Sequence, residues 1–222
     1  MPNLSKVKSV NHVTHDVLRL RIEKPKDFKY VPGQAVDIAI NKPGWDDKLS
    51  CFTFTSLPED DFLEFTIKIY PQRKRVTNEL LSIKAGDEVF VYKPFGDIHY
   101  KGDGIFIAGG AGITPFLAIL KVLEKEGKIK NNKLIFANKK KEDIIDREYF
   151  EKLLDKNFIN ILSDEEVEGY EHGFVNADLI KKYAQKGLDY YYLCGPDPMM
   201  KAVEKHLESL GVKPEQIVKE GF

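Results

Sequence analysis

The sequence pattern changes near residue 100, and this change constrains the fold more than any other feature. Before it, apolar and polar residues alternate in short runs such as Leu18–Ile22 and Ala35–Ile40. After it, continuous apolar runs such as Ile105–Ala108 are each followed by a helix-like segment. Period-two alternation is typical of antiparallel strands, whereas strands that alternate with helices predict a parallel, doubly wound sheet. We therefore expect two domains of different architecture, and a length of 222 residues suits two.

The first half, residues 1–100, is predicted to form a small antiparallel barrel of five or six strands. A polar turn at residues 58–61 and a Pro32-Gly33 turn separate the runs. The expected strands are Leu18–Ile22, Ala35–Ile40, Phe52–Leu57, Glu64–Tyr70 and Glu88–Tyr92, with one helical interruption near Thr77–Ile83.

The second half, residues 101–222, is predicted to form the doubly wound parallel sheet. Pro115 near the start of one helix, Asn176 as the N-cap of another and Gly211 after a third are typical helix boundary signals. The expected helices are Pro115–Glu126, Arg147–Leu154, Ala177–Ala184 and Pro198–Leu210. The boundary between the domains is expected near Lys101–Gly104.

Composition excludes several classes of protein. The 34 Lys and Arg residues balance 35 Asp and Glu residues, so no broad basic surface is available for nucleic acid or an acidic membrane. Two cysteines are too few for a disulfide framework or an Fe–S cluster. Residues 104–120 carry no charge, but they are too short to span a bilayer and are interrupted by glycines and Pro115. With no apolar run at the N-terminus, we expect a cytoplasmic protein without a membrane span.

Ligands of open parallel sheets bind at the carboxyl ends of the strands, near a reversal in strand order. Residues Gly109–Pro115 follow an apolar strand and precede a helix, so their backbone can approach a diphosphate closely. A tight turn without a ligand would have the same sequence, because a glycine-rich turn alone is weak evidence.

Three further segments fall at the same edge of the predicted sheet. They are Cys194–Met200, Asn138–Lys141 and the last three residues, Glu220–Phe222. If they bind no ligand, these segments are expected to be a buried thiol, a solvated lysine loop and a frayed chain end, respectively. In the barrel half, Phe52–Ser56 alternates aromatic and hydroxyl side chains, and a basic cluster at residues 73–75 precedes Val76. The five histidines show no spacing typical of metal ligands, so no metal site is predicted.

Taken in order along the chain, these segments resemble the ferredoxin–NADP reductase family, and in particular stand-alone bacterial ferredoxin or flavodoxin reductases. The resemblance covers essentially the whole chain. It implies a barrel that binds FAD, a second domain that binds NADH or NADPH, and a hydride transfer from nicotinamide to flavin. Electrons would then pass singly to an acceptor protein such as ferredoxin or flavodoxin.

The resemblance also implies roles for individual residues. Thr53, Cys194 and Glu220 would position the reacting groups and supply protons. The flavin-binding residues would be Ser50, Cys51, Phe52, Thr53, Lys68, Ile69, Arg75, Val76, Thr77, Asn78 and Phe222, where Phe222 would cover the flavin until nicotinamide displaces it. The nucleotide-binding residues would be Gly110, Gly112, Ile113, Thr114, Pro115, Asn138, Lys139, Asp164, Cys194, Gly195, Pro196 and Met199.

One departure from the family pattern concerns the flavin. Ser50 stands where the family usually has an arginine bonded to the flavin diphosphate. Loss of such a charge-assisted contact costs about 1.5–3 kcal/mol, roughly a tenfold to hundredfold loss of affinity. Our hypothesis is that the cluster Arg73–Arg75 supplies the missing charge. The alternatives are weak FAD binding, or the use of FMN or free flavin.

A second departure concerns the pyridine nucleotide. Asp164 lies where NADPH-preferring relatives often carry arginine, and Phe174 replaces another residue that is often arginine. A carboxylate there favours a free ribose hydroxyl, whereas Lys139–Lys141 could bind a 2′-phosphate. The residues favour NADH slightly. Two alternatives to an electron-transfer enzyme are a reductase of free flavin and a degenerate, non-catalytic nucleotide-binding subunit.

Overall fold

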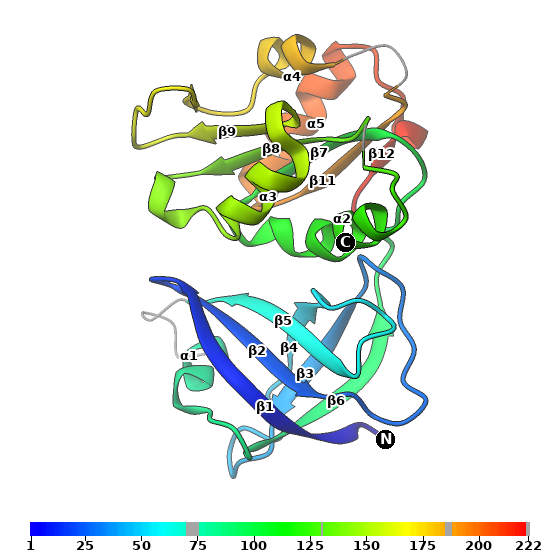
Figure 1. Ribbon diagram of the computed structural model, residues 1–222, viewed down its shortest axis with the longest axis vertical. Helices are drawn as coiled ribbons and strands as arrows, with labels where there is room; N and C mark the ends of the chain where they lie inside the picture. Colours follow the sequence, from blue (N-terminus) through cyan, green and yellow to red (C-terminus); the bar gives the residue numbers. More distant parts are fainter. Residues whose placement is uncertain (70–75, 130, 185–187, 221–222) are drawn as a thin grey trace.

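The barrel half is a six-stranded antiparallel sheet. The computed structural model describes residues 1–69, 76–129, 131–184 and 188–220 (Figure 1). The strand order is β4-β3-β6-β1-β2-β5, and an isolated bridge between Phe54 and Phe65 joins the two outer strands. The strands are β1 (Asn3–Thr14), β2 (Val17–Glu23), β3 (Ala35–Ile40), β4 (Ser50–Thr53), β5 (Phe62–Lys68) and β6 (Glu88–Phe95).

Alternate residues of these strands fill the barrel. Leu18, Leu20 and Ile22 of β2 are all buried and pack in one apolar core with Phe54 and Phe65. The single described helix of this half, α1 (Val76–Glu79), is followed by a 3₁₀ turn at Leu80–Ser82, so the predicted helical interruption is confirmed.

The second half is a six-stranded sheet in the order β10-β9-β8-β7-β11-β12, and every strand pair in it is parallel. Its strands are β7 (Gly104–Gly109), β8 (Lys133–Asn138), β9 (Phe158–Leu162), β10 (Glu171–His172), β11 (Tyr190–Cys194) and β12 (Ile217–Val218). Starting from β7, the strands β8, β9 and β10 are added on one side in chain order, whereas β11 and β12 are added on the other side. The strand order therefore reverses between β7 and β11.

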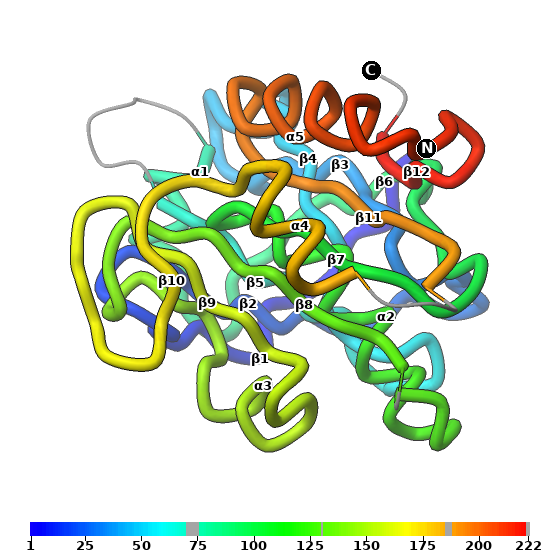
Figure 2. Tube along the Cα trace, turned by 90° about the horizontal axis from the view of Figure 1, so that it is seen from above, coloured from blue at the N-terminus to red at the C-terminus, as the bar shows by residue number. Residues whose placement is uncertain are grey.

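Helices cover both faces of this sheet, so the doubly wound fold is confirmed. Figure 2 shows α2 and α3 on one side of the sheet and α4 and α5 on the other. The helices are α2 (Thr114–Lys125), α3 (Arg147–Leu154), α4 (Ala177–Tyr183) and α5 (Asp197–Ser209). Successive residues of β7 pack on opposite sides: Phe106 joins the α2–α3 core and Ile107 the α4–α5 core. Asn176 caps α4, as predicted, by accepting the Leu179 N–H at 2.8 Å.

The structure corrects the predicted strands at two places. No strand is predicted at β1, because the polar Ser5 is buried in it while the apolar Leu4 is exposed, so its sequence lacks a regular apolar and polar alternation. Strand β4 ends at Thr53 instead of Leu57, since the Thr55 N–H leaves the β3 ladder and bonds to the Glu64 carbonyl at 2.8 Å. The boundary after residue 100 stays a prediction. None of the helices in the described ranges has both the length and the apolar character that a membrane crossing requires.

Tyr192 holds the backbone of residues 101 and 102, which lead into the second sheet. Its hydroxyl donates to the Gly102 carbonyl at 2.7 Å and accepts the N–H groups of Lys101 and Gly102 at 2.9 and 3.0 Å. Its ring stacks on Phe106 with the centroids 4.2 Å apart.

We expect Tyr192→Phe to lower the free energy of unfolding by about 1–3 kcal/mol, because three backbone groups lose their partner. Urea unfolding followed by circular dichroism measures this. Tyr191→Phe is the matched control, because the ring of this neighbouring tyrosine is buried while its hydroxyl makes no hydrogen bond within the described part of the chain. Equal unfolding midpoints for the two variants would contradict the prediction.

Candidate functional site

The reversal in strand order brings together two of the predicted segments. The 3₁₀ turn Gly110–Ile113 follows β7 and leads into α2, whereas Cys194 ends β11 beside it and leads into α5. A Cβ atom on Gly112 would lie 2.2 Å from the Cys194 carbonyl oxygen, so only glycine permits this approach. Gly110 has a φ of +51° and open space beyond its Cα, which leaves its backbone accessible to a ligand.

Glu220, which follows β12, lies at the same place. Its Oε2 accepts the Asp97 N–H at 3.2 Å, and a Cβ atom on Gly96 would lie 3.0 Å from its Oε1. Gly96 directly follows β6, and β6 pairs with β3, which in turn pairs with β4. Thr53 faces Ala35 of β3, whose other neighbour is Phe95 of β6. Thr53 is therefore connected to Glu220 through Ala35 of β3 and the end of β6.

Both cysteines are influenced by Glu220. Burial raises the pKa of the Cys194 thiol to about 12, and the Glu220 carboxylate adds to this shift. The pKa of the Cys51 thiol is raised to about 11 by desolvation of its sulfur, although the residue as a whole is exposed, with contributions from Asp37 and Glu220. Glu220 thus acts on both cysteines, and both thiols are neutral at physiological pH. Sequence reasoning did not identify the contribution of Gly96 and Asp97, because neither belongs to a motif.

The first strand of the predicted flavin site alternates its side chains. Phe52 of β4 is buried in the barrel core, where its ring centroid lies 6.5 Å from that of Phe65. Cys51 is exposed, and Ser50 and Thr53 are half-buried. On β5, Lys68 is half-buried and Ile69, directly after the strand, is buried. A contact between the Phe52 ring and a flavin stays a prediction.

Two orphaned polar atoms fall on predicted cofactor residues. Five buried side-chain atoms have no hydrogen-bond partner among the described residues, and two of them are the Thr77 hydroxyl at the start of α1 and the Asn138 amide nitrogen at the end of β8. Such atoms are rare in proteins and are explained where a ligand supplies the partner. Lys42, which the sequence did not indicate as a site residue, forms an ion pair with Glu79 at the end of α1. Arg75, with the rest of the cluster at residues 73–75, and Phe222 lie outside the described residues.

The ends of β8 and β9 carry the residues predicted to hold the nucleotide ribose. The Ser163 N–H bonds to the Asn138 carbonyl at 3.1 Å and the Asp164 N–H to the Lys139 carbonyl at 3.0 Å, so these residues adjoin. The Ser163 hydroxyl donates to Asp164 Oδ1 at 2.6 Å. Phe174, which is 79% exposed, lies beside them because the Gly173 N–H bonds to the Leu162 carbonyl. Gly195, Pro196 and Met199 line the opposite side of the turn, where Met199 Sδ lies close to Gly109.

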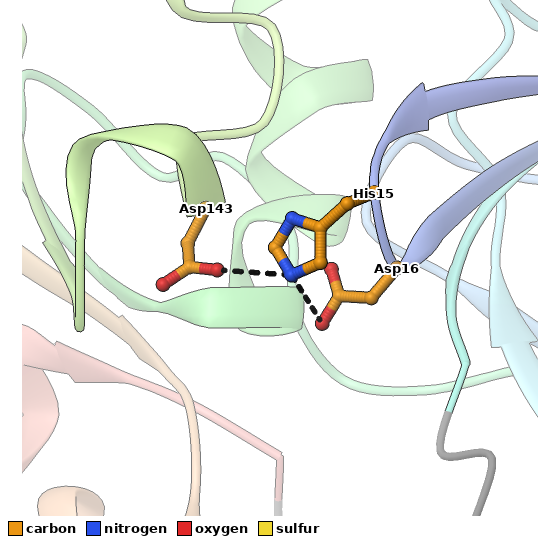
Figure 3. A group of neighbouring side chains, drawn as sticks. All are labelled: His15, Asp16 and Asp143. Carbon is orange, nitrogen blue, oxygen red and sulfur yellow. Dashed lines mark ion pairs between the residues drawn. The ribbon is translucent and has the colours of Figure 1, made fainter.

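Outside this edge, a group of three side chains bridges the two halves of the molecule. His15 Nε2 lies 3.8 Å from Asp16 Oδ2 and 3.6 Å from Asp143 Oδ1 (Figure 3). The spacing would suit a metal ion, yet Lys68 Nζ already contacts Asp16 Oδ2 at 2.8 Å. We interpret the group as a cluster of ion pairs between the β1–β2 turn and the loop before α3.

Family models for two kinds of domain match this chain. The profile of a FAD-binding domain matches residues 3–134 and that of an oxidoreductase NAD-binding domain matches residues 106–205. NADH-cytochrome b5 reductase 1 of Aspergillus terreus is 32% identical and covers 92% of this chain and 76% of that protein. The reductase component of propane 2-monooxygenase from Mycolicibacterium smegmatis is 30% identical and covers 98% of this chain and 67% of that protein.

Solved structures are similar in fold. The FAD/NAD-binding domain of a nitric oxide dioxygenase from Vibrio cholerae superposes with a TM-score of 0.85 at 22% identity, covering 98% of this chain and 97% of that one. The CS-b5R domains of human Ncb5or, in an NAD⁺ form, superpose with a TM-score of 0.86 at 26% identity, covering 98% of this chain and 68% of that one. A ferredoxin NADP⁺ reductase from Neisseria gonorrhoeae with bound FAD and NADP superposes with a TM-score of 0.82 at 18% identity, covering 97% of this chain and 96% of that one.

The neutral thiol at the end of β11 leads to a prediction about reactivity. In a Cys51→Ser variant, we expect iodoacetamide to label Cys194 at pH 8 at least about 100-fold more slowly than in the urea-unfolded chain, because only the thiolate reacts. Since the folded-state pKa is raised, the labelling rate should increase with pH up to about 12. Mass spectrometry of quenched samples measures the rate, and equal rates in the folded and unfolded chains would contradict the assignment.

Proposed function

We infer the activity from the family: the chain belongs to the ferredoxin–NADP reductase family of FAD- and NAD-binding oxidoreductases. It is an NAD(P)H-dependent flavoprotein reductase with FAD as its cofactor. We propose further that it passes electrons from NADH, through FAD, to a one-electron acceptor protein.

The observation that carries the site assignment is the pair of orphaned polar atoms. Thr77 Oγ1 and Asn138 Nδ2 are the buried atoms without partners that lie in the predicted flavin and nucleotide segments. A hydroxyl and an amide N–H are suitable donors for phosphate or ribose oxygens. The donor chemistry of the residues present thus fits both groups, and the open space at Gly110 leaves room for a ligand beside the turn that leads into α2.

Bound FAD would supply the redox chemistry, because a flavin accepts a hydride from reduced nicotinamide and can release electrons one at a time. The chain's own residues would orient and protect the reacting groups. The Asp97 N–H holds the Glu220 carboxylate at the strand reversal, where it can exchange a proton with solvent. The Cys194 thiol, neutral because of its raised pKa, gives the nicotinamide an uncharged, packed wall. The half-buried Thr53 offers a hydroxyl on the flavin side.

NADH is the proposed electron donor because of the charges around the ribose position. The Asp164 carboxylate can accept hydrogen bonds from two free ribose hydroxyls and would repel a 2′-phosphate. The exposed Phe174 offers an apolar face where many relatives have a cation. Lys139 adjoins Asp164 through its carbonyl group, and the lysines at residues 139–141 are the features that would favour NADPH.

The acceptor is proposed as a separate redox protein such as ferredoxin, flavodoxin or a similar carrier. The two cysteines of this chain cannot hold an Fe–S cluster. Relatives include a reductase component of a propane monooxygenase and reductases named for cytochrome b5, so the family accommodates carriers of several kinds. A reductase of free flavin is the alternative, and release of the flavin at each turnover would identify it.

The orphaned hydroxyl gives a direct test of the flavin site. We expect Thr77→Val to weaken FAD binding about tenfold, since one hydrogen bond to a charged group is lost. The apoprotein should unfold at the same urea concentration or a higher one, because the hydroxyl has no partner among the described residues. Quenching of flavin fluorescence measures affinity. A variant with unchanged affinity, or a wild-type protein that binds no flavin, would reject the assignment.

Two variants test the reaction. With NADH in excess, Glu220→Gln should lower the rate of flavin bleaching at 450 nm at least about tenfold while FAD stays bound, because the ionisable group is lost. Stopped-flow absorbance measures this rate, and an unchanged rate would remove Glu220 from the reaction.

Asp164→Ser should lower the KM for NADPH and raise the KM for NADH, since removal of the carboxylate removes the repulsion of a 2′-phosphate. Steady-state assays with both nucleotides measure these two constants.

A further inference from the structure

A buried carboxylate lies where the two halves of the molecule meet. The Glu64 side chain on β5 is only 3% exposed, yet it is surrounded by cations from both halves. Arg21 contributes Nε and Nη2, each 2.8 Å from Glu64 Oε2, and Lys121 of α2 contributes Nζ, 3.2 Å from Oε1. Burial acts to raise the pKa of Glu64, but the effect of Lys121, Arg19 and Arg21 is larger and the pKa is lowered. The carboxylate is therefore charged and needs these partners.

Lys121 makes a second contact across the same boundary. Its Nζ donates to the Thr55 carbonyl at 2.6 Å, and the Thr55 hydroxyl donates to Glu64 Oε1 at 3.1 Å. The ammonium is thus held by a carbonyl and a carboxylate at fixed positions on the barrel. Such a charge-assisted, partly buried arrangement is directional, unlike an ion pair in water.

The two ends of this contact are close to the two halves of the candidate site. Thr55 follows Thr53, the predicted flavin hydroxyl, by two residues. Lys121 follows Thr114, where α2 begins at the nucleotide turn, by seven residues, which is about 10 Å of rigid helix. Because Phe116, Leu117 and Leu120 pack α2 into the apolar core of the second half, α2 and the nucleotide turn form one body, and the contact of Lys121 with the barrel constrains where that body lies.

From these contacts we propose that Lys121 is a positioning residue, which sets the distance between the nucleotide turn of α2 and the flavin-binding strand β4. The inference rests on the proposed function, since it concerns the alignment of nicotinamide with flavin. Lys121 touches neither cofactor and acts through the Thr55 carbonyl and through α2. Transfer between two bound groups is sensitive to their separation, and a misplacement of about 1 Å can lower a rate about 100-fold.

A second lysine on the same helix provides a matched control. Lys125, one turn after Lys121, forms an ion pair with Glu59 across the same boundary. Its side chain is 60% exposed and that of Glu59 is 48% exposed, so this pair is free to rearrange in water. Both lysines have similar length and charge, and only Lys121 is anchored on a buried group.

The experiment compares Lys121→Met, Lys121→Arg and Lys125→Met as holoproteins loaded with FAD. For Lys121→Met, we expect FAD and NADH dissociation constants within about threefold of wild type but flavin reduction at least tenfold slower. The long-wavelength absorbance that reports stacking of NAD⁺ on reduced flavin should fall as well, which is a readout independent of turnover. Lys121→Arg should restore reduction to within about threefold, and Lys125→Met should behave as wild type.

Different failures have different meanings. If wild-type protein binds FAD but NADH does not reduce it, the proposed function fails. If wild type is active and Lys121→Met is reduced at the same rate, or loses no more than Lys125→Met, the positioning role is overturned. A tenfold loss of FAD affinity in Lys121→Met would also overturn it, because the lysine would then serve the structure of the flavin site. If Lys121→Met does not fold, Lys121→Leu, which likewise lacks a donor for the Thr55 carbonyl, replaces it with the same criteria.

Discussion

A parallel sheet that is covered by helices on both faces leaves only the ends of its strands for chemistry. In the second half of this protein, successive residues of β7 are buried in two separate cores, so no side chain of that strand is free to contact a ligand. β7 and β11 stay paired to their carboxyl ends, where the chain leaves them for helices on opposite faces of the sheet, and the backbone there is held by the contact of Gly112 with the Cys194 carbonyl. The position of the candidate site is a consequence of this packing.

The barrel contributes to the same place through its strand β6. Gly96 and Asp97 lie directly after this strand and hold Glu220, the residue that follows β12 at the other end of the chain. The boundary between the halves is partly apolar, because Val17 of β2 and Ile98 join the core formed by α2 and α3. Charged side chains at the same boundary add direction to this packing: Arg19 Nη2 contacts Asp146 Oδ2 at 2.5 Å. The two halves therefore meet through a surface that specifies their orientation.

Much of the fold follows from the sequence because burial leaves a periodic signal. The strong apolar runs predicted β7, β8, β9 and β11, and the Asn176 cap predicted the start of α4. β1 was missed because half of its residues face water and its inward residues are small or widely spaced. Thr53, Cys194 and Glu220 were predicted from the resemblance. The roles of Asp97, Lys42 and Lys121 depend on contacts between residues far apart in the chain, and no local pattern records such contacts.

The high pKa of Cys194 has a consequence for the durability of the enzyme. Reduced flavins react with dioxygen, and the peroxide that forms attacks thiolates far faster than thiols. A cysteine beside the flavin would therefore be the first residue exposed to a by-product of the enzyme's own reaction. Because burial and the Glu220 carboxylate keep this sulfur protonated, the proposed nicotinamide site would have a wall that resists oxidation at the point where the oxidant would be generated.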